Sequence, residues 1–218
     1  KLRIVKNKIM KKIILLISLV LGILTSNAQE GVNTLIKNSP FHFFDGTFNM
    51  SYEKAISNSK SLNLSGGFHL QNNSWNTKDE IGWTGELQIR KYLINFKKQE
   101  SVLSGMFVAP YIKGSYFRTE GDDWWYVQEY GYYDVDDVWI EEDGFYGSYS
   151  KEVNNIQGGL LMGVQMLFGN VISLELFLGG GIQYADIEGV DSYSDMTDGI
   201  KEYTGVVPRI GFNFGAAF

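Results

Sequence analysis

Few residues of this chain have the types and spacing that enzymatic chemistry requires. The chain has no cysteine and only two histidines, His42 and His69, which excludes thiol catalysis, thiolate metal sites and disulfides. His69 and Ser65 share one parity of an alternating segment, and a histidine with a serine and an acid can transfer an acyl group. Because no serine motif accompanies the pair, we expect no enzyme and assign no catalytic residue. Gly179–Gly181 lies inside a strand pattern rather than between a strand and a helix, so it is no phosphate loop.

The segment Arg118–Lys151 is rich in acidic and aromatic side chains. Trp and Tyr rings can stack on sugars or anchor a partner protein. The candidate surface-loop binding residues are Trp124, Trp125, Tyr126, Tyr130, Tyr132, Tyr133 and Trp139. An alternative is that the aromatics at the ends of the segment form an interfacial girdle and the acids a solvated, repulsive face. Asp134, Asp136 and Asp137 lack the spacing of a calcium-binding loop, so no metal and no cofactor is assigned.

Alternation of apolar with small or polar residues indicates the elements that must position these side chains. In Val206–Phe218, every second residue is apolar and the residues between are mostly small or polar. Successive side chains of a strand point to opposite faces, so this segment predicts a strand with one apolar face. Six further alternating segments are Gly46–Ala55, Ser61–Gln71, Trp83–Arg90, Val108–Ser115, Asn155–Met166 and Ile172–Gln183.

The connections between these segments predict an eighth strand. The short connections are Ser57–Ser59, Asn95–Ser101 and Phe168–Asn170, and the long ones are Asn72–Glu80, Arg118–Lys151 and Asp186–Tyr203. Short and long connections alternate, as in membrane β-barrels with short periplasmic turns and long extracellular loops. With both termini on the periplasmic side, one ascending strand is missing, and Gly31–Lys37 must supply it.

The start of the sequence predicts secretion. Lys11 and Lys12 precede an apolar run, Ile13–Leu24, and small residues follow it. This pattern is typical of a signal peptide, which we assign to residues 1–28 with a start at Met10, and residues 29–218 then form one domain. No apolar stretch of eighteen residues follows. A chain of this kind can cross a membrane only as a closed barrel, because lipid leaves a sheet edge unsatisfied.

Six charged residues have the inward parity of the predicted barrel. They are Glu53, Glu86, Arg90, Lys113, Glu175 and Arg209. The interior of an eight-stranded barrel is filled by its own side chains, and buried charges persist when they are paired. We therefore predict a lumen ion-pair network, with Glu53, Arg90 and Glu175 in the inner third and Arg209 as the candidate partner of Glu86. The alternative is a selectivity constriction, which requires a continuous water channel.

The chain resembles small eight-stranded outer-membrane barrels of the OmpA/OmpX type, and among them an uncharacterised Gram-negative family. The resemblance rests on Phe48–Glu53, Ser61–Leu62, Val108–Lys113 and Gly211–Phe212, and on the aromatic last residue. It implies that Phe214 and Phe218 form the assembly signal read by the outer-membrane assembly machinery. Its motifs are architectural, so it implies fold and location and no activity.

These observations predict an all-β, eight-stranded antiparallel transmembrane β-barrel in the outer membrane. Without residues 1–28 the chain has 13 basic and 25 acidic residues, a balance that argues against nucleic-acid binding. We expect a monomer that contacts outer-membrane lipid, the assembly machinery and a surface ligand or protein. The expected function is non-enzymatic: anchoring surface loops for adhesion, ligand contact or envelope integrity. The alternatives are a narrow passive channel, a lipid-modifying enzyme at the rim, and a soluble sandwich.

Overall fold

The computed structural model describes residues 31–73, 78–96, 101–125, 132–133, 139–140, 145–189 and 199–218. The predicted signal peptide, residues 1–28, lies outside these ranges. Within them, none of the helices has the length and apolar character needed to span a bilayer.

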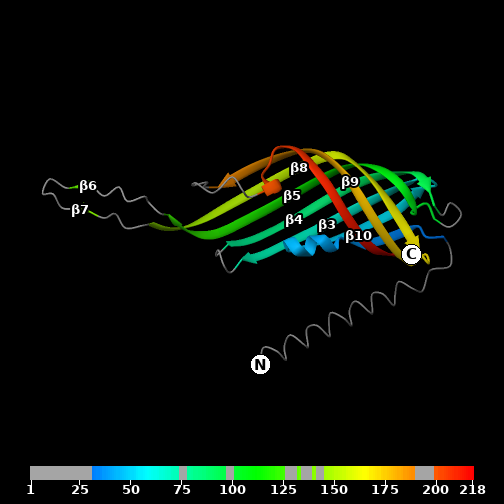
Figure 1. Ribbon diagram of the computed structural model, residues 1–218, viewed down its shortest axis with the longest axis horizontal. Coiled ribbons are helices and arrows are strands. Elements are labelled where there is room, and N and C mark those ends of the chain that lie inside the picture. The colour runs from blue at the N-terminus through cyan, green and yellow to red at the C-terminus, as the bar shows by residue number, and fades with distance from the viewer. Residues whose placement is uncertain are drawn as a thin grey trace, which may run out of the picture.

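Eight antiparallel strands close into a barrel (Figure 1). They are β1 (Thr34–Asn38), β2 (Thr47–Ser57), β3 (Lys60–Asn73), β4 (Lys78–Asn95), β5 (Gly105–Trp125), β8 (Phe145–Phe168), β9 (Ile172–Gly189) and β10 (Gly205–Ala217). Their order around the barrel is β1-β10-β9-β8-β5-β4-β3-β2. The predicted barrel is confirmed, and the two-sheet sandwich is excluded because the sheet closes on itself.

The register of the strands fixes the geometry of the barrel. A line of paired residues runs from Ser51 through Ser65, Glu86, Lys113, Gln157 and Gln183 to Gly205. Lys37 pairs with both Ser51 and Gly215, so the line returns to β10 displaced by ten residues, from Gly205 to Gly215. A displacement of this kind requires strands tilted from the barrel axis.

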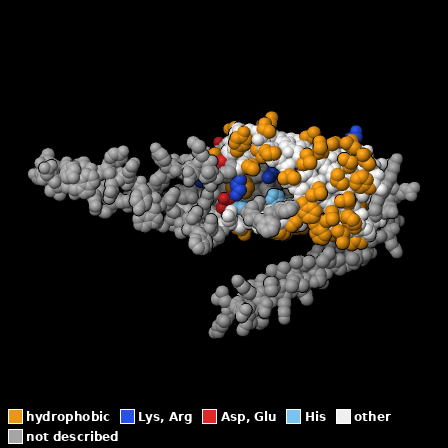
Figure 2. Space-filling model, in the orientation of Figure 1, with side chains coloured by type: hydrophobic (Ala, Val, Ile, Leu, Met, Phe, Trp, Pro, Cys, Tyr) orange, Lys and Arg blue, Asp and Glu red, His pale blue; other side chains and the backbone are white. Residues whose placement is uncertain are grey.

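The two alternating sets of side chains along the strands face opposite sides of the barrel wall, as their composition predicts. Outward-facing apolar side chains are exposed and form a belt around the barrel, for example Leu64, Trp83, Leu160 and Ile210, and Figure 2 shows this belt in orange. The inward-facing residues are mostly polar and buried. A barrel with an apolar outer surface and a polar interior is suited to a bilayer.

The ends of the barrel differ in their connections. At one end, termed the inner end here, Asn58–Ser59 joins β2 to β3 and Gly169–Val171 joins β8 to β9. Gly169 (φ 59°) and Asn170 (φ 56°) are left-handed, the conformation that a tight hairpin turn requires and that Gly and Asn adopt at little cost. The connection of β4 to β5, residues 96–104, also lies at this end. At the other, outer end the longest connection joins β5 to β8, whereas β3 and β4 are joined by residues 74–77 alone, so the long connection predicted at Asn72–Glu80 is wrong.

Several predicted strand limits are wrong. β5 runs on to Trp125 and β8 begins at Phe145, and these strands pair throughout, so the two ends of the predicted loop Arg118–Lys151, residues 118–125 and 145–151, are strand. The connection itself contains two short strands, β6 (Tyr132–Tyr133) and β7 (Trp139–Ile140), which pair with each other. The limits were missed because beyond the bilayer both faces of a strand meet water and the alternation disappears.

The first strand is also shorter and later than predicted. β1 covers Thr34–Asn38 rather than Gly31–Lys37. It ends before Pro40, which has no N–H for strand pairing and opens the 3-10 helix η2 (Pro40–Asp45). Gly46 (φ 75°) then turns the chain into β2.

Candidate functional site: the barrel lumen

Two acids and two bases form a buried cluster near the inner end of the lumen. Lys37 Nζ lies 2.5 Å from Glu53 Oε2 and 2.5 Å from Glu175 Oε2. Arg90 binds Glu175 through both terminal nitrogens, at 2.7 and 3.0 Å, and contacts Glu53 at 3.0 Å. All four side chains are at most 1% exposed. Opposite charges in this arrangement compensate one another's desolvation.

Neutral side chains bind the remaining atoms of the carboxylates. The Tyr92 hydroxyl donates to Glu53 Oε1 at 2.8 Å, Ser61 donates to the same oxygen, and Asn213 donates to Glu175 at 3.0 Å. Gln165 accepts from Lys37 at 3.0 Å and donates to the Tyr92 oxygen at 2.7 Å. Each acid is thus held by several donors, which fixes the cluster in one geometry.

An apolar layer lies against this cluster. Leu103, from the segment before β5, is fully buried with Leu35, Phe107 and Leu161. Gln165 Nε2 donates to the Leu103 carbonyl at 2.9 Å, and Ser101 donates to the Val32 carbonyl at 2.7 Å. Residues 101–104 are therefore tied into the inner end of the barrel, and with the ion cluster they fill that end.

A second ion pair lies farther toward the outer end. Arg209 Nη2 is 2.8 Å from Glu86 Oε2, and the Arg209 guanidinium lies 4.4 Å from the centre of the Tyr111 ring. Gln88 links the two levels: it donates to Glu86 at 2.5 Å and accepts from Arg90 Nε at 2.8 Å. The sixth predicted lumen residue, Lys113, is the cross-strand partner of Glu86 and is half-buried.

Residues 199–204, which precede β10, lie across the outer mouth of the barrel. They contain the short helix η3 (Gly199–Lys201). Gln183 donates to the carbonyls of Ile200 and Tyr203, at 2.6 and 2.9 Å. Lys201 pairs with Glu80 on β4, and Lys151 Nζ lies 2.7 Å from Glu202. Residues 199–204 therefore bridge opposite walls of the barrel.

His69 belongs to this outer level. Thr47 Oγ1 lies 2.8 Å from His69 Nδ1, and Glu80 Oε1 lies 3.1 Å from His69 Nε2. Ser65, the residue considered with His69 from the sequence, is at a lower position of β3 on the same face. The side chains that contact the two ring nitrogens of His69 are Thr47 and Glu80. Its imidazole connects β2, β3 and β4 below the segment that carries Lys201.

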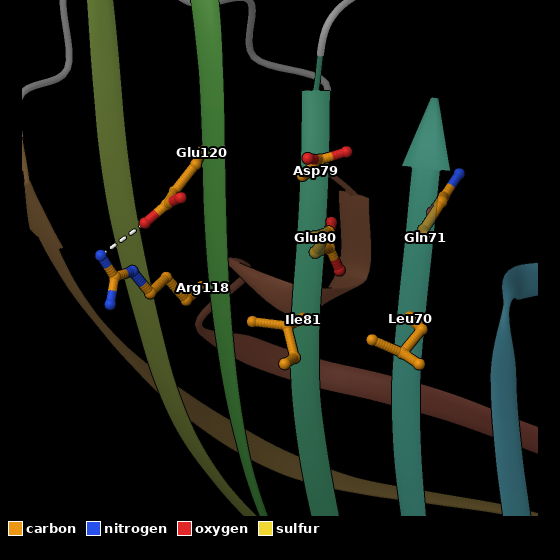
Figure 3. Close-up of a pocket in the computed structure, with 7 residues that line it drawn as sticks. All are labelled: Leu70, Gln71, Asp79, Glu80, Ile81, Arg118 and Glu120. Atoms are coloured by element: carbon orange, nitrogen blue, oxygen red, sulfur yellow. Dashed lines mark ion pairs between the residues drawn. The ribbon is translucent and has the colours of Figure 1, made fainter. Parts of the chain in front are cut away.

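A groove of about 480 Å³ lies on the outer wall at this end (Figure 3). Leu70 and Ile81 form its apolar part, and Arg118 and Glu120 form an exposed ion pair at its side. Asp79 lies directly opposite Glu120 on the neighbouring strand. Within the described residues, no three His, Asp or Glu side chains are grouped so as to hold a metal ion.

The aromatic candidates of the surface segment lie on three elements. Trp124 and Trp125 end β5, where they pair with Tyr146 and Phe145. Tyr132 and Tyr133 form β6, and Trp139 begins β7 opposite Tyr133. Tyr126 and Tyr130 lie outside the described residues. The pairing places both tryptophans of β5 on a two-stranded extension beyond the last residues that β4 and β9 reach.

The predicted assembly residues lie on the closing strand. Phe214 faces outward and is exposed, and it pairs with Asn38 of β1. Phe218 follows β10, and its N–H and carbonyl bond to Thr34 at 2.9 and 3.1 Å. The backbone of Phe218 thus takes part in closing the barrel.

Comparison with known proteins finds solved structures of similar fold, but no matching sequence family. No family model matches the chain, and no curated protein matches it. The N-terminal β-barrel domain of Pseudomonas aeruginosa OprF is 14% identical, with 87% of this chain and 100% of that one covered and a TM-score of 0.33. Acinetobacter baumannii CarO2 is 10% identical, with 87% and 99% covered and a TM-score of 0.39. A major outer membrane protein from Thermus thermophilus is 16% identical, with 86% and 99% covered and a TM-score of 0.40.

These similarities are too low to transfer any property, and the strand order and the apolar belt decide the architecture. The chain folds as a small eight-stranded β-barrel of the membrane-spanning type.

The sequence pattern missed one member of the inner cluster of this barrel. Lys37 shares the inward parity with Leu35 in a five-residue strand, which is too short for a clear alternation. A charge count could have found it, because Arg90 alone cannot balance both Glu53 and Glu175. The segment of Lys201 and Glu202 was missed for another reason: it is an irregular connection, and no periodicity shows that such a segment turns inward.

Proposed function

We propose that this protein is a non-enzymatic barrel of the outer membrane that carries a binding hairpin at the cell surface. In this proposal the barrel is an anchor. The hairpin, formed by the outer ends of β5 and β8 and the residues between them, contacts a ligand or another cell.

The observation that carries the proposal is the length of two strands. About 9–11 residues of a tilted strand cross a bilayer, whereas β5 has 21 residues and β8 has 24. From Asp122 to Trp125, β5 pairs with β8 alone. This two-stranded part extends past the rest of the barrel (Figure 1), and it carries Trp124 and Trp125.

The filled lumen supports an anchor over the alternative of a passive channel. The Lys37, Glu53, Arg90 and Glu175 cluster and the buried Leu103 fill the inner end, and residues 199–204 cross the outer mouth. An ion would have to displace buried, paired charges to pass. We expect purified protein in planar bilayers to show no discrete conductance steps, and regular steps would favour the channel.

The test of surface binding uses intact cells. Binding of cells that express the full chain to a glycan array is compared with binding of cells whose hairpin is shortened, because Trp and Tyr rings can stack on sugars. A matched variant replaces Trp124 and Trp125 by Ser in the full-length hairpin. We expect binding by the full chain only. Equal binding by all three strains, at equal surface amounts, would contradict the proposal.

A further inference from the structure

The barrel wall is incomplete between β10 and β2. β1 pairs with β10 only from Leu35 to Asn38, and after Asn38 the chain forms η2 instead of a longer strand. The outer part of β10, Gly205–Asn213, pairs with β9 on one side, and no other described strand pairs with it. Along this part the wall lacks one strand, and the space between β10 and η2 is termed the gap here.

Three residues, Val206, Pro208 and Ile210, form the open edge of β10. The Phe212 carbonyl points toward η2, where it accepts from Ser39 Oγ at 3.2 Å, and every second residue of an antiparallel strand points its backbone groups the same way. The N–H and carbonyl groups of Val206 and Ile210 therefore face the gap, and no hydrogen bond joins them to another described residue on this side. Pro208 contributes only a carbonyl, because proline has no N–H.

The open edge lies at the level of the apolar belt. Val206 is 73% exposed and Ile210 86%, and their partners on β9, Ile182 and Leu178, are exposed as well. Backbone groups without partners are strongly unfavourable in hydrocarbon, and they occur only where they meet protein or a polar cavity. Figure 2 shows a hollow in the wall in which charged and histidine side chains are visible. The polar interior therefore opens sideways toward the bilayer through the gap.

Pro208 indicates that the gap does not receive another strand. A strand added to the open edge would place a carbonyl opposite Pro208, where it finds no N–H donor. Proline is also one of the residues by which proteins protect edge strands from pairing with other chains. The open edge is therefore suited to a small molecule, whose polar groups do not have to match the spacing of a strand ladder.

The charged side chains around the hollow already have partners. The ion pairs are Arg209 with Glu86, Lys201 with Glu80, and Lys151 with Glu202. Arg209 also hydrogen-bonds the Tyr111 hydroxyl, and Lys113 and His69 take part in interactions of their own. A charged ligand would have to compete with one of these buried or half-buried pairs, whereas an uncharged ligand leaves them intact.

The polar groups that remain are both donors and acceptors. The open edge presents N–H groups and carbonyls. Across the lumen, Gln157 Nε2 is buried and has no hydrogen-bond partner among the described residues. β8, which carries Gln157, lies opposite β2 in the ring of eight strands, and the row of paired residues through Gln157 reaches Gly205 at the start of β10. Hydroxyl groups donate and accept, so they match this set of partners without carrying a charge.

The gap also defines the apolar part of the ligand. The exposed rings of Phe43 in η2 and Phe48 in β2 lie 5.9 Å apart on one side of it, and Ile210 lies on the other. Because neighbouring strands are about 4.8 Å apart, a wall that lacks one strand leaves room for one hydrocarbon chain. The inner end of the lumen is filled and residues 199–204 cross the outer mouth, so the described part of the barrel leaves the bilayer as the approach for such a chain.

We propose that the gap is a side entrance through which the barrel takes up a single-chain lipid with an uncharged, hydroxyl-bearing head group. The hydroxyls bond the open edge of β10 and Gln157, and the chain stays in the bilayer between Ile210 and Phe43. This site is independent of the surface hairpin, and it remains if the hairpin binds nothing.

The binding test compares three probes with the same chain on the folded full-length protein in lipid nanodiscs. Monoolein has two hydroxyls and no charge, oleate has a carboxylate, and methyl oleate has no hydrogen-bond donor. Each is labelled with ¹³C at its carbonyl carbon. We expect monoolein to show a resonance that is absent from empty nanodiscs. Oleate and methyl oleate should reach about a tenth of its occupancy or less.

Two variants locate the bound head group. Gln157→Leu removes the donor across the lumen and should weaken occupancy by monoolein about fivefold. Ile210→Pro removes an N–H of the open edge, which takes part in no strand ladder, so the barrel should fold while occupancy falls. The matched controls are Ile210→Leu, which keeps the N–H, and Ser173→Ala, which removes a buried hydroxyl of the inner layer that also has no described partner.

Three results would overturn the binding site. They are no distinct monoolein resonance with folded wild type, occupancy equal to wild type in both Gln157→Leu and Ile210→Pro, and binding of oleate or methyl oleate as strong as that of monoolein. Folding of every variant is verified by heat-modifiable migration in gels.

The route is tested with single cysteines, because the chain has none of its own. A bulky maleimide on Ile210→Cys blocks the gap and should slow the uptake of monoolein severalfold. The same label on Ile200→Cys, an exposed position of η3 at the outer mouth, should leave the rate unchanged. The reverse pattern would overturn entry through the wall.

A second copy of the chain at the open edge is the competing occupant. In membranes under oxidising conditions, unlabelled Ile210→Cys should form no more disulfide-linked dimer than Leu160→Cys, an exposed belt position on β8. A clear excess of dimer at Ile210→Cys would show that another copy covers the gap and would overturn the side entrance.

Discussion

Lys37 determines the charge balance of the inner lumen. It contacts both Glu53 and Glu175, and without it Arg90 would face two buried carboxylates. Its position on the shortest barrel strand also makes it a link between β1 and β9. The cluster therefore couples β1 through side chains to β9, the next strand but one around the barrel, in addition to the backbone pairing.

Replacing Lys37 by Met should destabilise the barrel strongly. Breaking a buried ion pair by removing one partner costs about 3–5 kcal/mol, because the other charge stays buried without compensation. The measurement is the free energy of unfolding in urea, followed by heat-modifiable gel migration. Lys60→Met, at an exposed position of the inner hairpin, is the matched control and should change stability by less than about 0.5 kcal/mol.

Removing Arg209 should have a smaller effect of the same kind. Arg209→Ala leaves Glu86 without its contact at 2.8 Å, but Lys113 lies directly across from Glu86 and can compensate part of the charge. We expect a loss of about 3 kcal/mol, at the lower end of the range for buried pairs. Adding Glu86→Gln should recover part of it, and unchanged urea resistance of Arg209→Ala would show that the pair contributes nothing.

For single residues, the sequence predicts which side chains face the lumen. It does not predict which of these side chains contact one another. Alternation alone places Glu53, Arg90, Glu175, Glu86 and Arg209 inside. Which of them meet depends on the offset of ten residues around the barrel, because that offset brings β1 and β9 to the same level. Strand register is set by all the strands together and cannot be read from one segment.

Among the strands, β5 and β8 differ from the rest because their inner and outer parts are paired differently. Their inner parts are paired on both sides, and their outer ends are paired only with each other. A two-stranded ribbon is marginally stable in water. We therefore expect the hairpin to depend on the barrel, and the barrel not to depend on the hairpin.

Shortening the hairpin tests this asymmetry. Gly121 and Tyr149 are paired, so a two-residue Asn-Gly turn can join them in place of residues 122–148. We expect folded yield in the membrane to stay within about twofold of wild type, because loop changes at the solvent side cost little closure entropy.

A deletion with different limits is the informative comparison. Replacing residues 119–143 by a Gly/Ser linker removes Thr119, which is buried and paired with Lys151. This variant should fold poorly. Equal yields of the two variants would contradict the strand limits of β5 and β8.

The limits of β5 and β8 show which features of the strands could be predicted from the sequence. The number of strands, their order and the short inner turns follow from alternation and turn residues. The outer ends of β5 and β8 and the helix η2 do not, because there the pattern is set by local pairing and by Pro40 and Gly46 rather than by an apolar face.

The molecule as a whole is closed by few backbone pairs. β1 has five residues and pairs with both β2 and β10, and Phe218 adds hydrogen bonds to Asn33 and Thr34. Ending the chain at Ala217 removes these bonds and the last aromatic ring. We expect secreted protein that lacks the heat-modifiable folded form, whereas Phe218→Tyr, which keeps the backbone and a ring, should fold. Normal migration of the truncated chain would contradict the role of Phe218 in closure.

The pairing of β1 with β10 also has a kinetic consequence. Leu35 and Ala217, which are paired, are separated by 182 positions along the chain (217 − 35). Contacts between residues this distant form slowly, because a long loop must close before any pairing compensates the lost entropy. Joining of the two edge strands is therefore the expected rate-limiting event of folding. Substitutions in Thr34–Asn38 should slow refolding more than they accelerate unfolding, whereas those in the β8–β9 turn should do the reverse.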